Sequence, residues 1–155
     1  MGYQICALDS DKFSHLYGLD DDSLFEHRAR RIQVDKKPGF PCRVTLEDAD
    51  IGESVLLLNY EHLGVDSPYR SAHAIFVQEG AITCPPFVNE IPEQLVLRVL
   101  SIRAFDRDGM MVDADVVDGK GSEPVIKGLL AIRDVDYLHI HNAKPGCYAA
   151  RVDRS

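Results

Sequence analysis

The sequence predicts an α+β fold: an antiparallel-sheet-rich single domain over residues 1–155, with two short N-terminal helices and one longer helix near residues 122–133. Three observations lead to this prediction. Several short segments alternate apolar and polar residues, as strands with one exposed face do. The 155 residues, 45% of them apolar, suit one hydrophobic core. No shift in composition and no long linker divides the chain.

The first half of the chain is expected to combine short helices with strands. The expected elements are a strand at 3–8, helices at 11–17 and 20–30, and strands at 53–60 and 72–77. Acidic residues begin the second helix, and the basic residues His27–Arg31 end it. Because acids near the start and bases near the end complement the helix dipole, we interpret this basic cluster as structural.

A hairpin is expected around residues 107–109, with Gly109 in a left-handed conformation. A three-residue loop there places Ala104 opposite Val112 and Arg103 opposite Asp113. Apolar residues then share one face, while Arg103 and Asp113 form a solvated charge pair on the other. Beyond the hairpin, apolar residues at helical spacing predict the longer helix.

Residues 137–141 alternate strictly, so Tyr137, His139 and His141 should project from one face of a strand. The turn that follows would contain five residues, 142–146, and would place His141 opposite Cys147. Residues directly opposite each other in a hairpin have Cβ atoms about 5 Å apart. An imidazole and a thiol in these positions would be in contact.

Three interpretations of this hairpin stay open. His139 and His141, with Cys147 as a third donor, would suit a soft metal ion, but the acidic ligand typical of such His-x-His sites is missing. We therefore assign no metal ligands and expect no cofactor, and a metal site at His139 and His141 stays an alternative. Alternatively, Cys147 is the nucleophile of a small enzyme and His141 lowers its pKa, although a hairpin offers no helix dipole. The third interpretation is a polar strand face with two ordinary histidines and a buried thiol.

A second polar segment surrounds an expected turn near residue 68. Strand ends and their loops often present polar groups to ligands, and a guanidinium beside an imidazole suits a small carboxylate or phosphate. We therefore predict that a small anionic ligand binds near Tyr69 and Arg70, with His73 as a further contact. The simpler alternative is a local ion pair between Arg70 and Asp66 or Glu61.

The composition and charge of the chain limit the kinds of partner that it can bind. The net charge of −8 argues against a nucleic-acid surface, because phosphate binding requires clustered Lys and Arg. No apolar run approaches the ~20 residues of a membrane span, and no signal peptide is recognisable at the N-terminus. The widely spaced cysteines suggest reduced thiols. We expect a cytoplasmic protein whose partner is a small anionic molecule; oligomeric state and enzymatic activity stay open.

Four stretches support a family resemblance. They are Ser-Pro-Tyr-Arg at 67–70, Ile-Phe-Val at 75–77, Arg-Ala-Phe-Asp at 103–106 and His-Ile-His-Asn-Ala-Lys-Pro-Gly-Cys at 139–147. From Arg31 to the C-terminus the chain resembles a bacterial single-domain family catalogued only as a domain of unknown function. The resemblance implies a stand-alone protein with no assigned activity, cofactor or partner. It also implies that relatives carry other residues in place of His73 and His141, which weighs against an essential catalytic role for either.

Overall fold

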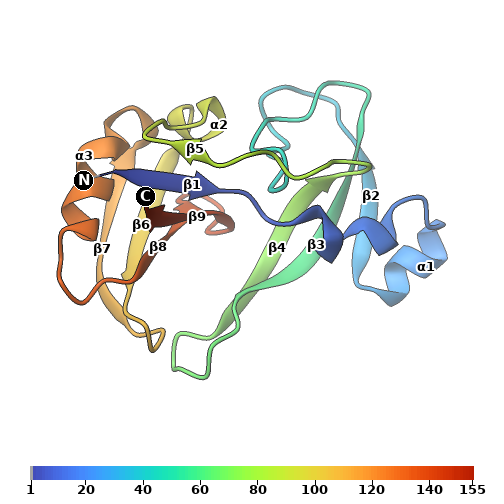
Figure 1. Ribbon diagram of the computed structural model, residues 1–155. Helices are drawn as coiled ribbons and strands as arrows, with labels where there is room; N and C mark the ends of the chain where they lie inside the picture. Colours follow the sequence, from blue (N-terminus) through green and yellow to red (C-terminus); the bar gives the residue numbers. More distant parts are fainter. Residues whose placement is uncertain (1) are drawn as a thin grey trace. The chain divides into compact units, whose positions relative to one another are not determined.

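Figure 1 shows the computed structural model, which describes residues 2–155 and consists mainly of antiparallel strands with few helices. Contacts along the chain group it into two compact units, and each is described by itself. The six-stranded unit contains the N-terminal residues up to Cys6, Glu61–His73 and Pro85–Ser155; the three-stranded unit contains Ala7–Tyr60 and Ala74–Cys84. The sheet-rich α+β class is confirmed, while the single domain over residues 1–155 stays a prediction.

The six-stranded unit is built on one sheet with the strand order β5-β1-β9-β8-β6-β7. Its strands are β1 Tyr3–Cys6, β5 Phe87–Val88, β6 Val99–Phe105, β7 Met111–Asp118, β8 Tyr137–Asn142 and β9 Tyr148–Arg154. Its helices are α2 Glu93–Val96 and α3 Ser122–Leu130, the latter preceded by a 3-10 turn at Gly119–Gly121. The longer helix is therefore present, although it ends before the expected residue 133.

Helix α3 covers one face of this sheet and packs against β6, β7 and β8 (Figure 1). Alternate residues of the central strands, such as Ile102, Leu138 and Ile140, are fully buried. Helix α3 contributes Ile126 and Leu130, which are also buried. Because successive side chains of a strand point to opposite faces, the polar residues of β6 and β8 lie on the face of the sheet away from α3.

The three-stranded unit contains most of a sheet with the order β2-β3-β4. Its elements are 3-10 turns at Ser10–Lys12 and Ser14–Leu16, α1 Asp21–Glu26, β2 Ala29–Gln33, β3 Ser54–Leu63 and β4 Ser71–Gln78. Val34, Ala49 and Val55 form a buried cluster there. Residues 61–63 of β3 and 71–73 of β4, together with the turn between them, group with the six-stranded unit.

The N-terminal helices differ from the prediction. The first, expected at 11–17, is replaced by two 3-10 turns, and the second ends at Glu26 rather than near residue 30. The Asp20 side chain caps this helix by accepting a hydrogen bond from the Ser23 N–H at 2.8 Å. Arg28 then adopts a left-handed φ of 56°, which ends the helix and leads into β2. The basic residues from position 29 onward thus belong to a strand, and their dipole interpretation is wrong.

The register of the β6–β7 hairpin is a second correction. Gly109 is left-handed as predicted, with φ 78°, and the Asp106 N–H donates to the Met110 carbonyl across a three-residue loop. Beyond this loop the register shifts, so Ala104 pairs with Asp113 and Arg103 with Ala114. Arg103 consequently lies opposite Ala114 and shares no face with Asp113. Because residues 112–116 of β7 are all exposed, no burial pattern could reveal this bulge.

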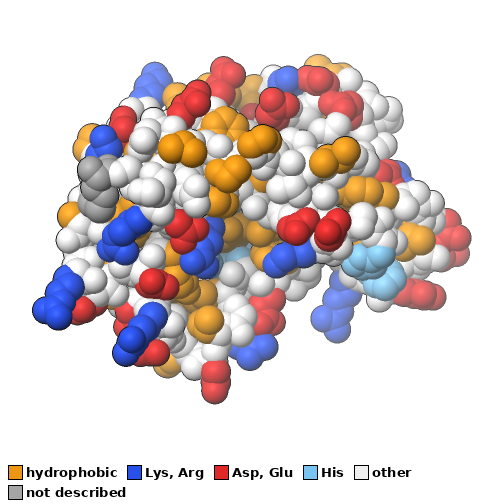
Figure 2. Space-filling model, in the orientation of Figure 1, with side chains coloured by type: hydrophobic (Ala, Val, Ile, Leu, Met, Phe, Trp, Pro, Cys, Tyr) orange, Lys and Arg blue, Asp and Glu red, His pale blue; other side chains and the backbone are white. Residues whose placement is uncertain are grey.

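The surface carries charges of both signs. Basic and acidic side chains are interspersed on the face of the molecule shown in Figure 2. Within residues 2–155, no helix combines the length and the apolar composition that crossing a bilayer demands.

Candidate functional site

Strand β8 carries three aromatic or imidazole rings on the sheet face opposite α3. Tyr137 and His139 have ring centroids 5.1 Å apart, and those of His139 and His141 are 6.4 Å apart. The predicted sharing of one face by these side chains is confirmed. All three are buried, with His139 only 4% exposed and His141 only 1% exposed. We call this surface of the six-stranded sheet the histidine face.

The hairpin segment Glu61–His73 brings a further imidazole to the histidine face. The His62 ring lies edge-on to His141, with centroids 4.8 Å apart, and stacks on Tyr148 of β9 at 5.6 Å. Tyr148 in turn contacts His139 edge-on at 5.0 Å. The two polar segments that the sequence singles out therefore meet within the six-stranded unit.

Two arginines from neighbouring strands flank His139. The register places Arg103 of β6 directly beside His139, and it places Arg151 of β9 on the other side. Arg151 pairs with Asp153 at 2.9 Å, and its guanidinium lies 4.2 Å from the centroid of the Tyr137 ring. Arg103 is half-buried, and its Nε donates to Ser101 Oγ at 3.2 Å. Within residues 2–155 the Arg103 guanidinium forms no ion pair with a carboxylate.

The electrostatic environment keeps the two β8 histidines neutral. Burial, together with the nearby His141, His62, Arg151 and Arg103, lowers the pKa of His139 to about 3. Burial is also the largest cause of a pKa of about 3 for His141, and a hydrogen bond to Gly146 opposes this shift. Arg103, His62 and His73 add to the lowering for His141. Among the groups that act on these two imidazoles, Arg103 and Arg151 carry a positive charge, and Arg151 is paired with Asp153.

Burial acts on Arg103 as well. It lowers the pKa of the guanidinium, although an arginine stays protonated at physiological pH. A charged group that is partly desolvated and lacks a counter-charge is energetically unfavourable. Such a group favours the binding of an anion.

The hydrogen bonds of the imidazoles determine which ring nitrogens could donate to a ligand or accept from it. His141 Nδ1 lies 2.9 Å from the Gly146 carbonyl oxygen, and because a carbonyl can only accept, Nδ1 carries the proton. The Nε2 atom of neutral His141 is then an acceptor. His139 Nδ1 is buried and has no hydrogen-bond partner within residues 2–155. His62 Nε2 lies 2.9 Å from Ser71 Oγ.

The residues predicted to bind an anion, Tyr69, Arg70 and His73, each make a different contact. Arg70 Nη2 forms an ion pair with Glu61 Oε1 at 2.9 Å, which is the simpler alternative considered above. Tyr69 is 39% exposed and lies edge-on to Phe105 at 6.1 Å. His73 lies close enough to His141 to lower its pKa. Arg70 therefore already has a carboxylate partner, and the binding of an anion by these three residues stays a prediction.

The predicted pairing of His141 with Cys147 is wrong. His141 pairs with Tyr148, and the Asn142 N–H donates to the Cys147 carbonyl at 2.9 Å, so the turn contains four residues rather than five. Gly146, with φ 83°, closes this shorter turn, and the register shifts beyond it. Asn142 Nδ2 also donates to Cys147 Sγ at 3.7 Å in a buried environment. The thiol is therefore part of the turn's packing, and no helix N-terminus accompanies it.

The histidine face also includes residues that sequence reasoning did not select. Arg103 was assigned to a solvated pair with Asp113, and His62 was not among the candidate site residues. Only the β6–β8 pairing reveals Arg103 as a neighbour of His139. Within residues 2–155 no group of three or more His, Cys, Asp or Glu side chains is arranged to hold a metal ion.

The fold and site define a sheet-rich α+β protein with a histidine-lined sheet face that two arginines flank. The chain belongs to the family described as Protein of unknown function (DUF1203), whose model matches residues 39–154. The resemblance to a family of unknown function is thereby confirmed, and the match includes the whole histidine face. Comparison with curated proteins gave no match, and neither did comparison with solved structures.

Proposed function

We propose that this protein binds a small anion on the histidine face, with the Arg103 guanidinium as its main contact. The observation that carries the proposal is the half-buried guanidinium without a carboxylate partner within residues 2–155, beside two buried neutral imidazoles. A bound anion would offset the cost of desolvating this charge. The anion would also lie near the positive charge of Arg103, which acts on both His139 and His141.

The chemistry of the donors favours a carboxylate or a phosphate. A guanidinium presents a planar fork of N–H donors that matches two oxygens of either group. Neutral His141 donates through Nδ1 to Gly146, so its Nε2 would accept an O–H from the ligand. A hydroxy-carboxylate and a singly protonated phosphate each carry both features. His73 belongs to this proposed site, Tyr69 to its edge, and Arg70 is a secondary contact because Glu61 neutralises it.

Isothermal titration calorimetry with inorganic phosphate, sulfate and citrate at pH 7 and low salt tests the proposal. We expect Arg103→Gln to weaken the affinity at least roughly ten-fold, because a hydrogen bond to a charged group contributes about 1.5–3 kcal/mol. Arg107→Gln is the matched control, since Arg107 is an exposed arginine in the β6–β7 turn. Equal affinities of Arg103→Gln and the parent protein would refute the proposal, as would an absence of binding for all three anions.

A further inference from the structure

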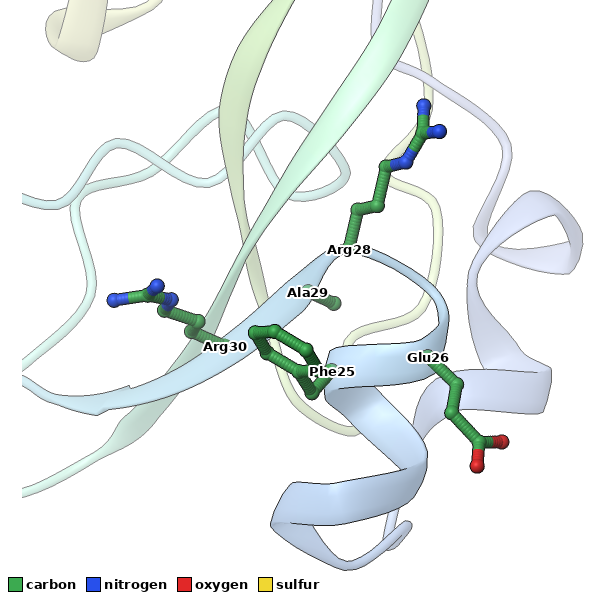
Figure 3. A pocket seen from close by; sticks show the side chains of 5 residues that line it. All are labelled: Phe25, Glu26, Arg28, Ala29 and Arg30. Carbon is green, nitrogen blue, oxygen red and sulfur yellow. The ribbon is translucent and has the colours of Figure 1, made fainter.

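One surface pocket of the three-stranded unit is lined by arginines that do not converge. It lies where α1 ends and β2 begins, and its volume is about 570 Å³. Figure 3 shows the guanidiniums of Arg28 and Arg30 directed away from each other and from the Phe25 ring. The adjoining pocket of about 360 Å³ is also lined by Asp21 and Asp22. The positive charges in this region therefore do not surround a common point.

A second pocket of the same unit has a different lining. It lies between the two 3-10 turns, the end of α1 and strand β3, and its volume is about 230 Å³. Its polar lining consists of Lys12, His15, His27, Asn59 and Tyr60, all of which belong to the three-stranded unit. No Asp or Glu of residues 2–155 lines this pocket. In a chain with a net charge of −8, such a lining favours an anion over a cation.

The local fold brings these side chains together from three segments. Phe13, which lies between the two 3-10 turns, is buried and packs edge-on to Tyr60 of β3, with ring centroids 5.8 Å apart. This contact holds the turns against the strand. The His15 ring lies edge-on to the ring of His27, the C-cap residue of α1, at 5.7 Å. The polar groups thus rest on a packed apolar layer that also includes the buried Leu58.

The Lys12 ammonium is held at this pocket and not in an ion pair. Its Nζ donates to Tyr60 Oη at 3.2 Å and lies 5.5 Å from the centroid of the Tyr60 ring. Asp9 and Asp11 are close to it in sequence, yet within residues 2–155 Lys12 forms no ion pair with a carboxylate. An ammonium group has three N–H donors, so two of them stay available to a ligand.

His15, His27 and Asn59 add further donors. Within residues 2–155 none of these three side chains forms a hydrogen bond, and the two imidazoles contact each other only through their ring edges and faces. Each imidazole offers at least one N–H, and the amide offers two. All three side chains are exposed, so a ligand can reach them from solvent. The pocket therefore combines one positive charge with several unused donors.

From these observations we infer that Lys12, His15 and His27 bind a phosphoryl group, which comes either from inorganic phosphate or from a small phosphate monoester. A tetrahedral group with several acceptor oxygens suits donors that approach from three segments of the chain. Lysine binds phosphate as a compact charge with rotatable donors. The volume of about 230 Å³ lies below the range of drug-sized sites, so the ligand is small. This site shares no residue with the histidine face, so the two proposals succeed or fail independently.

An NMR titration of histidine-labelled Arg103→Gln protein with sodium phosphate at constant pH 7 tests the inference. This background removes the main contact of the histidine face, so the response reports on the second site. The imidazole signals of His15 and His27, assigned through the variants His15→Gln and His27→Gln, should move in a saturable manner. Sodium chloride at the same ionic strength should leave both signals in place.

Calorimetry of lysine variants measures the contribution of the ammonium group. Lys12→Gln should weaken phosphate affinity at least roughly five-fold, because it removes a charge-assisted hydrogen bond. Lys36→Gln is the matched control, since Lys36 is another exposed lysine of the three-stranded unit without an ion pair within residues 2–155. Lys12 is exposed as well, so both variants should unfold at the temperature of the parent protein, which separates a loss of binding from a loss of folding.

Glycerol 3-phosphate as a second probe distinguishes the two sources of the phosphoryl group. Tighter binding of this monoester, with the same sensitivity to Lys12→Gln, would support the inference and identify a small phosphorylated molecule as the ligand. Tighter binding of inorganic phosphate would support it as well and identify free phosphate as the ligand.

Three outcomes would overturn the inference. The first is that the signals of His15 and His27 do not respond to phosphate, or respond equally to chloride. The second is equal phosphate affinity of Lys12→Gln and Lys36→Gln. The third is a response of these signals in the parent protein that is lost in Arg103→Gln, which would place the phosphate at the histidine face alone.

Discussion

At position 139 an imidazole is buried among Phe105, Tyr137 and Tyr148, with ring centroids between 5.0 and 5.4 Å from its own. Its Nδ1 has no hydrogen-bond partner within residues 2–155, and burial lowers its pKa to about 3. A buried polar atom in this state reduces stability relative to an apolar ring of similar shape. The proposed anion site would account for an imidazole at this position.

His139→Phe tests this explanation at the residue scale. A phenyl ring fits among the same aromatic neighbours and removes the unsatisfied nitrogen, so the free energy of unfolding at pH 7 should rise by about 1–3 kcal/mol. Urea denaturation measures this change, and the affinity for phosphate or sulfate should fall in the same variant. A loss of stability would show that the imidazole makes stabilising interactions in the folded protein, and would contradict this explanation.

Arg70 differs from Arg103 because it has a carboxylate partner. Its ion pair with Glu61 joins two side chains that are 56% and 45% exposed, and exposed pairs contribute about 0–1 kcal/mol. Arg70→Gln should therefore change the free energy of unfolding by less than about 1 kcal/mol and reduce anion affinity less than Arg103→Gln does. If Arg70→Gln removed binding and Arg103→Gln did not, the site would lie at the hairpin turn instead.

At the scale of elements, the segment Glu61–His73 is anchored to the six-stranded sheet. Leu63 packs with Phe105 and Tyr137 in a buried cluster. Ser67 Oγ donates to the Gly109 carbonyl at 2.9 Å. These contacts hold His62 over the histidine face, so the β6–β7 turn supports the site although it lies outside it.

Gly109→Ala tests this anchoring. A β-carbon at Gly109 would overlap Val65 Cγ2, and φ there is 78°. Gly18→Ala is the matched control, because Gly18 has φ 76° and no atom within 4 Å of an added β-carbon. The control should lose about 1 kcal/mol from backbone strain alone. Gly109→Ala should lose at least roughly 1 kcal/mol more, because overpacking adds to the strain.

Chemical denaturation of both variants measures the difference, and anion affinity should fall only in Gly109→Ala. Equal destabilisation of the two variants would mean that the segment can move away from the turn without cost, and would contradict the proposed anchoring.

Sequence alternation predicted the strands and one face of the site, but not the pairing between strands. In β8 the strict alternation sufficed to group Tyr137, His139 and His141. In β7 residues 112–116 alternate between apolar and acidic but are all exposed, so the alternation could not reveal the bulge that separates Asp113 from the face of Arg103. The His141–Cys147 pairing failed for a similar reason: one residue of turn length decides which side chain lies opposite.

At the scale of the molecule, the two buried histidines couple stability to pH. In the unfolded chain their pKa is about 6.5, whereas in the folded protein it is about 3. Between pH 7 and pH 5 the unfolded chain therefore binds protons that the folded protein does not bind. The stabilisation is present above the unfolded pKa and is lost as the pH falls.

We expect the free energy of unfolding to decrease by roughly 2–4 kcal/mol between pH 7 and pH 5 through these two residues. In His139→Phe the decrease should be about half as large, because only His141 then contributes. Urea denaturation at several pH values compares the two proteins. Stability that stayed constant or rose towards pH 5 in the parent protein would contradict the assigned burial of neutral imidazoles.

The proposed anion site lies beside Arg103, His139 and His141. Its most direct test is an NMR titration of histidine-labelled protein with sulfate, which does not change its own charge in this pH range. The imidazole signals of His139 and His141 should move in a saturable manner in the parent protein and in Arg107→Gln, and should stay in place in Arg103→Gln. Signals that do not respond in the parent protein, or that respond equally in Arg103→Gln, would contradict the claim.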